Sequence, residues 1–190
     1  MNSDLPASAA APGHDDPAYT QGGAWLSWWK LPLLIALLIA AADQFTKMLV
    51  IRRLPLRADH VVVPDFFHLV HLRNTGAAWG MMRGQTAWLA LLSILVFMFV
   101  IWKFPALTEG RRERALGLGL VLGGIAGNLI DRLGRGEVVD FLLFYYRSFQ
   151  WPAFNLADSA ICTGVAIFIL STLFREHHEH TCRSTSGRRD

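Results

Sequence analysis

Acidic side chains in apolar surroundings are the residues of this sequence best suited to chemistry. Asp140 stands between Val139 and Phe141, and Asp158 follows Asn155 at the start of another apolar run. Two carboxylates that share a site cannot both ionise easily, so such a pair holds a single proton. This arrangement suits peptide hydrolysis, because the ionised partner takes a proton from the attacking water. The protonated partner stabilises the developing oxyanion and then helps the amine to leave.

Further polar residues are spaced so that a helix would place them on one face. Asn128, Asp131 and Arg132 occupy positions i, i+3 and i+4, and we expect Asp131 and Arg132 to form a buried ion pair. Asp43 and Lys47 lie at i and i+4 and can also pair. This second pair could mark a helix end at headgroup level, but we favour an inward-facing pair, because a lipid-facing aspartate would be costly.

The composition indicates that these residues belong to a membrane protein. Of the 190 residues, 53% are hydrophobic and only 17% are charged, far from the values of ordinary soluble domains. The net charge of +3 shows no basic face of the kind that binds nucleic acid, and the two cysteines imply no disulfide framework. Four stretches predict spans, at about residues 28–50, 84–102, 115–133 and 154–174.

The segments outside the spans complete the predicted organisation. Residues 1–23 predict a disordered N-terminal extension, 24–175 a membrane domain, and 176–190 a polar cytoplasmic tail. Residues 51–85 contain β-rich runs bounded by turn residues, so a small sheet is expected on the membrane surface. The fold class is therefore an all-α membrane protein of four transmembrane helices with a small β-rich platform.

Basic residues set the expected orientation. The short loop at 103–114 carries four of them, which places this loop and both termini in the cytoplasm. Asp43, Asp131, Asp140 and Asp158 then fall at or just beyond the outer ends of the spans. We expect them to converge on one level.

Metal binding, transport and a purely structural role account less well for the acidic residues. A metal site needs several oxygens at regular spacing, and the gaps between these aspartates match no ligand motif. A proton-coupled transporter, the alternative from another class, would usually show two related halves and a path of carboxylates, and neither is visible. A structural role suits Asp131 better than it suits Asp140 or Asp158. The histidines and Cys182 of the tail could bind a metal, but a solvated tail is the more common case.

Four sequence blocks resemble one known family, the lipoprotein signal peptidases, or bacterial signal peptidase II. The resemblance covers about residues 25–175 and rests on the blocks DQFTK (43–47), NTGAAWG (74–80), GGIAGNLIDRLGRGEVVDFL (123–142) and WPAFNLADSAI (151–161). It implies a membrane aspartyl protease with Asp140 and Asp158 as the catalytic pair. The implied substrate is a prolipoprotein carrying diacylglyceryl on its cysteine, with cleavage just before that cysteine.

The resemblance also implies a location and a set of supporting residues. It places a multi-pass enzyme in the bacterial inner membrane, its site near the periplasmic face beneath a covering segment. We expect no cofactor and no metal, contact with membrane lipids, and a monomer. Plain turn chemistry would explain Asn74 and Gly76 equally well, and the helix glycines predict close packing. The residues expected to bind substrate or support the site are Asp43, Lys47, Asn74, Gly76, Asn128, Asp131, Arg132, Asn155 and Ala157.

Overall fold

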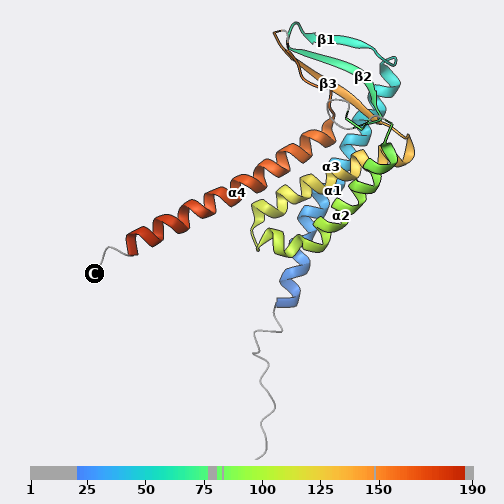
Figure 1. Ribbon diagram of the computed structural model, residues 1–190. Coiled ribbons are helices and arrows are strands. Elements are labelled where there is room, and N and C mark those ends of the chain that lie inside the picture. Colours follow the sequence, from blue (N-terminus) through green and yellow to red (C-terminus); the bar gives the residue numbers. More distant parts are fainter. Residues whose placement is uncertain (1–20, 77–80, 83, 148, 187–190) are drawn as a thin grey trace, which may run out of the picture.

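Four long helices and a small antiparallel sheet make up the protein (Figure 1). The structure is a computed structural model that describes residues 21–76, 81–82, 84–147 and 149–186, with side chains from residue 29 to residue 174 of these ranges. The helices are α1 Gln21–Arg53, α2 Thr86–Thr108, α3 Arg112–Gly134 and α4 Leu156–Ser186; the strands are β1 Asp59–Val63, β2 Phe67–Asn74, β3 Val138–Tyr146 and β4 Phe149–Gln150.

Each helix contains a stretch long and apolar enough to cross a membrane. These stretches are Trp29–Arg53, Thr86–Thr108, Arg112–Gly134 and Leu156–Phe174. Their outward faces expose large apolar side chains, such as Leu33 at 66% and Trp102 at 72%. Exposure on this scale suits contact with lipid, and the helical backbone satisfies its own hydrogen bonds there. The predicted fold class, four membrane helices with a small sheet, is confirmed.

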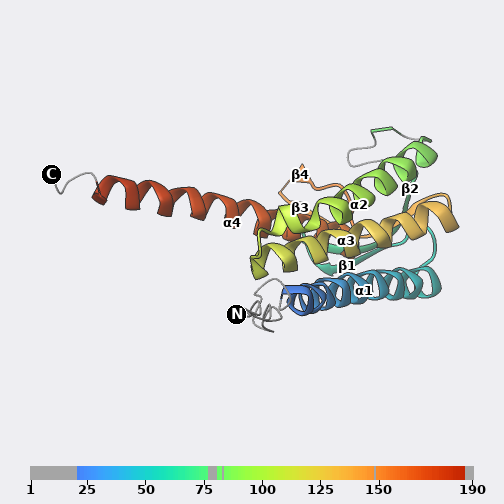
Figure 2. The same cartoon turned by 90° about the horizontal axis from the view of Figure 1, so that it is seen from below.

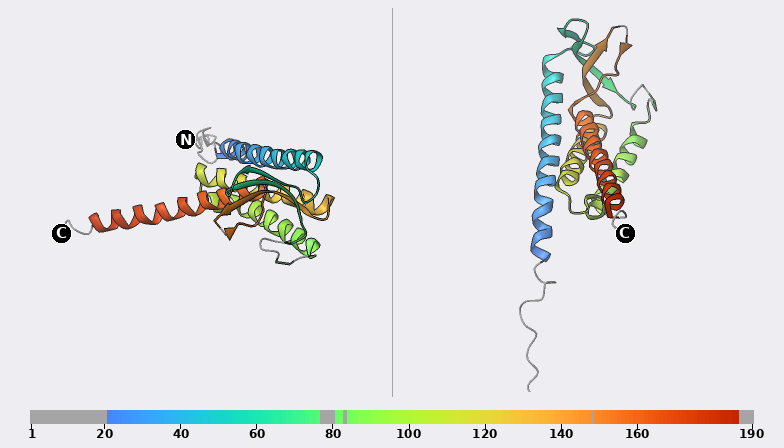
Figure 3. Two further views of the ribbon diagram at one scale, coloured as in Figure 1. Left: turned by 90° about the horizontal axis from the view of Figure 1, so that it is seen from above. Right: turned by 90° about the vertical axis from the view of Figure 1, so that its left-hand side faces the viewer.

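Helix α3 lies at the centre of the helical group, packed against α1, α2 and α4 (Figures 1 and 3). Its apolar stretch is 61% buried, against 17% to 22% for the other three helices. Glycines make this approach possible, because a Cβ on Gly123 would lie 2.7 Å from Ala36 O of α1. A Cβ on Gly127 would lie 2.6 Å from Asp43 Oδ2 and 3.3 Å from Ala157 Cβ. The predicted packing role of these glycines is confirmed.

The sheet lies at one end of the helices, with strand order β1-β2-β3-β4 (Figure 1). Strand β3 follows directly after α3 and pairs with β2, so that Asp140 lies opposite Leu72 and Val138 opposite Asn74. Val139 and Phe141 of β3 are buried against Val50 of α1. The sheet therefore rests on the end of α1 and holds Asp140 next to the helices.

The predicted N-terminal extension and the predicted loop at 103–114 differ from the structure. Residues 21–23, expected to be disordered, form the first turn of α1, and residues 1–20 lie outside the described part. Helix α2 continues through Lys103, whose ammonium lies over the Trp102 ring, and ends where Glu109 adopts a left-handed conformation. The predicted loop at 103–114 is therefore only residues 109–111. Charged residues near a helix end do not break the helix. The prediction ended the second span at the first charged residue, and this boundary was therefore wrong.

The segments around the last span also differ from the prediction. The segment between the predicted third and fourth spans contains strands β3 and β4, formed by a run of β-branched and aromatic residues. Helix α4 extends to Ser186, into the segment 176–190 that we expected to be a polar tail outside the span, because neither glycine nor proline occurs between Gly164 and Gly187. Its last turns project away from the other helices (Figure 2). The side chains of the His-rich tail lie outside the described residues.

Candidate active site

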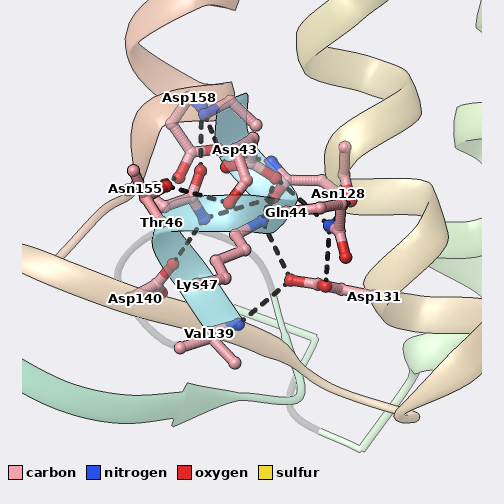
Figure 4. Close-up of polar contacts among 12 residues, drawn as sticks. Asp43, Gln44, Thr46, Lys47, Asn128, Asp131, Val139, Asp140, Asn155 and Asp158 are labelled. Atoms are coloured by element: carbon pink, nitrogen blue, oxygen red, sulfur yellow. Dashed lines mark hydrogen bonds and ion pairs between the residues drawn. The ribbon is translucent and has the colours of Figure 1, made fainter. Parts of the chain in front are cut away.

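Polar side chains from three helices and two strands meet at the sheet end of the bundle, as predicted for the acidic residues (Figure 4). They are largely buried, and they form one connected network of hydrogen bonds and ion pairs. The members described below are Asp43, Gln44, Lys47, Asn74, Asn128, Asp131, Arg135, Asp140, Asn155 and Asp158.

Lys47 lies at the centre of this network. Its ammonium contacts Asp43 Oδ2 at 2.7 Å, Asp131 Oδ2 at 2.9 Å and Asn128 Oδ1 at 2.9 Å. The side chains of Lys47 and both aspartates are fully buried. An ammonium has three N–H groups, so these three acceptors satisfy it completely. The predicted inward-facing pair of Asp43 and Lys47 is confirmed.

Asp131 pairs with Lys47 and Arg135, and not with Arg132 as we expected. The reason is helix geometry, because Arg135 lies one turn after Asp131 on the same face, whereas adjacent residues point in different directions. Asp131 Oδ2 also accepts the N–H of Val139 at 3.3 Å. This bond ties α3 to β3, which agrees with the structural role expected of Asp131.

The start of α4 is fixed from two directions. Asp43 Oδ1 on α1 accepts the N–H of Ala157 at 3.0 Å, which satisfies one of the free donors of the first helical turn. Asn155 and Asp158 form a capping box: Asp158 N–H donates to Asn155 Oδ1 at 3.0 Å, and Asn155 N–H donates to Asp158 Oδ2 at 3.2 Å. The Asp158 carboxylate is therefore held at the N-terminus of a helix, where negative charge is stabilised.

Amide side chains connect Asp140 to Asp158. Asn155 Nδ2 donates to Asp140 Oδ1 at 2.8 Å, while the same residue caps Asp158. Asn128 Nδ2 donates to Asp158 Oδ1 at 2.7 Å, and Asn74 Nδ2 donates to Asp140 Oδ2 at 3.0 Å. Within the part of the chain that the structure describes, no ion pair reaches either carboxylate. Both groups are oriented by neutral donors.

The environment of Asp140 favours its protonated form. Burial and the neighbouring Asp158 carboxylate raise the pKa of Asp140 to about 7, although hydrogen bonds from Asn74 and Asn155 and the charge of Lys47 oppose the shift. The residue is only 4% exposed. Desolvation disfavours the charged form of a carboxyl group, and a second carboxylate nearby adds to the effect.

A cavity opens beside Asp158. It has a volume of about 420 Å³ and is lined by Asp158 and Cys162 of α4 together with the segment before the helix, including Trp151 and Phe154. Its lining is mostly apolar. Asp158 is half-buried at this cavity, whereas Asp140 is buried beside it in the network.

The remaining predicted residues divide between the network and its edge. Asn74 serves both roles considered from the sequence, supporting the site and forming a turn. Its Nδ2 donates to Asp140, and its Oδ1 accepts the N–H of Gly76 at 2.9 Å. Arg132 lies half-buried within electrostatic reach of Asp140 and Asp158. Residues 77–80, the end of the second sequence block, lie outside the described part.

Two members of the network were not predicted from the sequence. Gln44 donates to Gly127 O and Asp131 Oδ1, each at 3.0 Å, and Arg135 Nη1 donates to Gln44 Oε1 at 3.0 Å. A signal for Arg135 existed, since it lies four residues after Asp131. The capping box was also readable from Asn155 and Asp158, three residues apart before an apolar run.

Four bilayer-length helices with a carboxylate and amide cluster at the sheet end define a polytopic membrane protein with a candidate acid-base site. The family model of signal peptidase (SPase) II matches residues 35–174. The lipoprotein signal peptidase of Syntrophotalea carbinolica is 43% identical over 152 residues, which cover 77% of this chain and 92% of that protein. The lipoprotein signal peptidase of Bacillus subtilis is 41% identical over 140 residues, covering 74% and 91%. The chain belongs to the signal peptidase II family.

Solved structures agree with this assignment. Two of them, each described as a bacterial membrane enzyme, match with TM-scores of 0.70 and 0.68 at 28% and 30% identity. The matches cover 84% and 75% of this chain and 92% of each solved chain. They therefore support the fold over most of its length.

Proposed function

We propose that this membrane peptidase removes the signal peptide from prolipoproteins and uses Asp140 and Asp158 as its catalytic pair. The proposed reaction is supported by family membership, and the relatives at 41% to 43% identity are lipoprotein signal peptidases. The observation that supports the pair is local: two carboxylates share a network with neutral amide donors, and one of them borders an apolar cavity. The transporter alternative has no support in these relatives.

The two carboxylates take different roles in the proposed mechanism. Asp158 is the base, because it borders the cavity and its helix N-terminus stabilises the carboxylate. It takes a proton from water as the water oxygen bonds to the scissile carbonyl carbon. Asp140, whose pKa of about 7 keeps a large share of it protonated near neutral pH, donates its proton to the carbonyl oxygen.

The second half of the reaction restores the pair. The tetrahedral intermediate collapses, and the bond from carbon to nitrogen breaks as Asp158 passes its proton to the departing amine. Asp140 recovers its proton from the hydroxyl group of the intermediate. No covalent enzyme intermediate is needed. Arg132, within electrostatic reach of both carboxylates, is suited to hold a substrate carbonyl group near the pair.

The proposed substrate is a prolipoprotein whose cysteine already carries diacylglyceryl. The apolar cavity beside Asp158 offers room for the residues next to the scissile bond. Residues 24–175 form the peptidase domain in this proposal, acting as a monomer among membrane lipids, and the family model covers most of that range.

We further propose that the site lies near the periplasmic face of the inner membrane, with both termini in the cytoplasm. Four spans put the two termini on one side, and the turn between α2 and α3, at the end opposite the sheet, is flanked by Lys103, Arg111, Arg112 and Arg114. Reporter fusions at Gly110 should read cytoplasmic, and fusions in the turn between β1 and β2 should read periplasmic. A periplasmic signal at Gly110 would overturn the orientation.

The decisive experiment for the pair is a double-mutant comparison in detergent with a lipidated prolipoprotein. Asp140→Asn and Asp158→Asn should each remove nearly all cleavage, a loss of about 10² to 10⁴ in rate. The double variant should be little worse than either single, because the two groups act as a unit. Substrate binding and a folded state should persist in all three. Near-normal turnover in either single variant would reject that residue.

An assay in the presence of a strong chelator distinguishes this mechanism from metal catalysis. We expect cleavage by the wild-type enzyme to continue after treatment with a strong chelator. Activity that disappears with chelator and returns with an added divalent ion would replace the acid-base pair with a metal site.

A further inference from the structure

We propose that Lys47 is a positioning residue for catalysis: it fixes the direction of the Asn128 amide and thereby holds a hydrogen-bond donor against Asp158. The proposal rests on the function proposed for Asp158. It gives the buried ammonium a role beyond joining α1 to α3, since that ammonium is linked to the reacting carboxylate through a single side chain (Figure 4).

The chemistry of the ammonium determines which atom of Asn128 faces it. An amide side chain can present either its oxygen or its NH₂ group, but an ammonium only donates. Lys47 Nζ lies 2.9 Å from the terminal atom of Asn128, so that atom must be Oδ1. The NH₂ group then points the other way, and Nδ2 donates to Asp158 Oδ1 at 2.7 Å.

The second amide of the site supports the same direction. Asp158 N–H can only donate, so it fixes Asn155 Oδ1 toward α4 and leaves Asn155 Nδ2 for Asp140 Oδ1 and Asn128 Oδ1. If Asn128 turned over, its oxygen would face Asp158 Oδ1 at hydrogen-bond distance and its NH₂ group would face the ammonium and Asn155 Nδ2. Each of these contacts would be repulsive, so Lys47 and Asn155 together exclude the reversed amide.

The consequence for the reaction concerns the base. A donor aimed at Asp158 Oδ1 stabilises the carboxylate and leaves its other lone pairs for water. A freely rotating Asn128 would present its oxygen to Asp158 for part of the time. Two oxygens form a hydrogen bond only if one carries a proton, so this orientation would favour the protonated form of Asp158 and weaken it as a base. Lys47 therefore acts on proton transfer without touching substrate.

The first test is Asn128→Asp, which keeps the size of the side chain. The new carboxylate still accepts from Lys47 and Asn155, but it offers Asp158 a donor only when it is protonated. We expect kcat at neutral pH to fall by roughly 10- to 100-fold, the loss typical of a hydrogen bond to a charged group. KM should change little, and part of the activity should return at lower pH, so that the optimum becomes more acidic. A wild-type pH profile in folded Asn128→Asp protein would overturn the proposal.

The second test removes the ammonium while preserving charge balance. Lys47→Met with Asp43→Asn deletes one positive and one negative charge and leaves Asp131 paired with Arg135. We expect a fall in kcat and an altered pH profile, with KM nearly unchanged. The matched control is Gln44→Leu, which disturbs contacts with Asp131 and Arg135 in the same cluster but none with Asn128. It should lower the melting temperature and leave the pH profile as in wild type.

The outcomes distinguish this proposal from the catalytic assignment on which it rests. Turnover by Asp158→Asn would reject the base itself. Inactive Asp158→Asn together with a folded Lys47→Met/Asp43→Asn enzyme of normal kcat and pH profile would reject only the positioning role. If that double variant does not fold, the pH profile of Asn128→Asp decides.

Discussion

The network contains two pairs of aspartates with opposite surroundings. Asp43 and Asp131 are fully buried, and both contact the ammonium of Lys47. Asp140 and Asp158 are held by asparagine amides and the α4 backbone, and among the described residues they form no ion pair. Asp158 also borders a cavity, which neither Asp43 nor Asp131 lines. One pair is neutralised by a cation and closed off. The other is held by neutral donors, and its member Asp158 borders the cavity, while Asp140 is buried beside it.

This difference separates structural carboxylates from reactive ones. A buried carboxylate that contacts a buried cation cannot be removed without leaving that cation without a partner, so its role is structural. A carboxyl group held by neutral donors keeps its orientation and can still gain or lose a proton, as the raised pKa of Asp140 shows. The first pair joins α1 and α3 to the start of α4 and to β3, and the second uses the geometry that results.

The largest effect on stability should come from the cation-paired side. Asp131→Asn removes one partner of a buried ammonium and of Arg135, and losing such a partner typically costs about 3 kcal/mol or more. Thermal unfolding in detergent should show a clear fall in the melting temperature and in folded yield, with turnover remaining in the folded fraction. Asp59→Asn is the control, because its exposed contact with His68 contributes little. A melting temperature equal to wild type would show that the two pairs do not differ in this way.

A smaller effect should appear in the pH dependence of stability. Asp140 has a pKa of about 7 when folded and a reference value of 3.8, so the unfolded chain loses this proton first as pH rises. The contribution of the group to folding is therefore complete at low pH and declines between about pH 4 and pH 7. Asparagine cannot ionise, so the stability of Asp140→Asn relative to wild type should increase by about 3 kcal/mol from pH 4.5 to pH 8. If the stability difference between Asp140→Asn and wild type were the same at both pH values, the raised pKa would be contradicted.

The smallest effect concerns the accessible side. Cys162 is exposed, lies one helical turn after Asp158 and lines the same cavity. Cys162→Ser should change turnover by no more than about twofold, because surface substitutions usually have little effect. A bulky maleimide should inhibit wild-type enzyme by filling the cavity and leave Cys162→Ser active. Inhibition of both would place the blocked site elsewhere, and inhibition of neither would show that substrate does not use this cavity.

The sequence predicted the spans, the sheet of residues 51–85 and most members of the polar network, but not Gln44 or Arg135, because apolar runs and i, i+4 spacing are local signals. It also predicted that Asp43 and Lys47 pair. The predicted partner of Asp131 was wrong. Arg132 was chosen because it is nearest in sequence, whereas the contact with Lys47 depends on how α1 lies against α3. Strand β3 was not predicted, although the β-branched and aromatic run around Asp140 is itself a local strand signal.

Several further contacts depend on tertiary structure that no local pattern encodes. The bond from Asp43 to the N–H of Ala157 joins residues 114 positions apart. The direction of the Asn128 amide depends on a lysine from one helix and an aspartate from another. Asp140 and Asn74 meet because β2 and β3 pair in one particular register.

The most direct test of the division between structural and reactive carboxylates is to measure turnover per folded molecule for four isosteric variants side by side: Asp43→Asn, Asp131→Asn, Asp140→Asn and Asp158→Asn. Each should be purified in detergent, quantified as folded protein and assayed on the same lipidated prolipoprotein. We expect a loss in rate of about 10² to 10⁴ for the Asp140 and Asp158 variants. At neutral pH Asp140→Asn should be at least as stable as wild type, and Asp158→Asn should lose only the small stabilisation of its capping box. The Asp43 and Asp131 variants should show lower stability but substantial turnover. A well-folded Asp131→Asn enzyme without turnover, or an active Asp140→Asn or Asp158→Asn enzyme, would contradict this division.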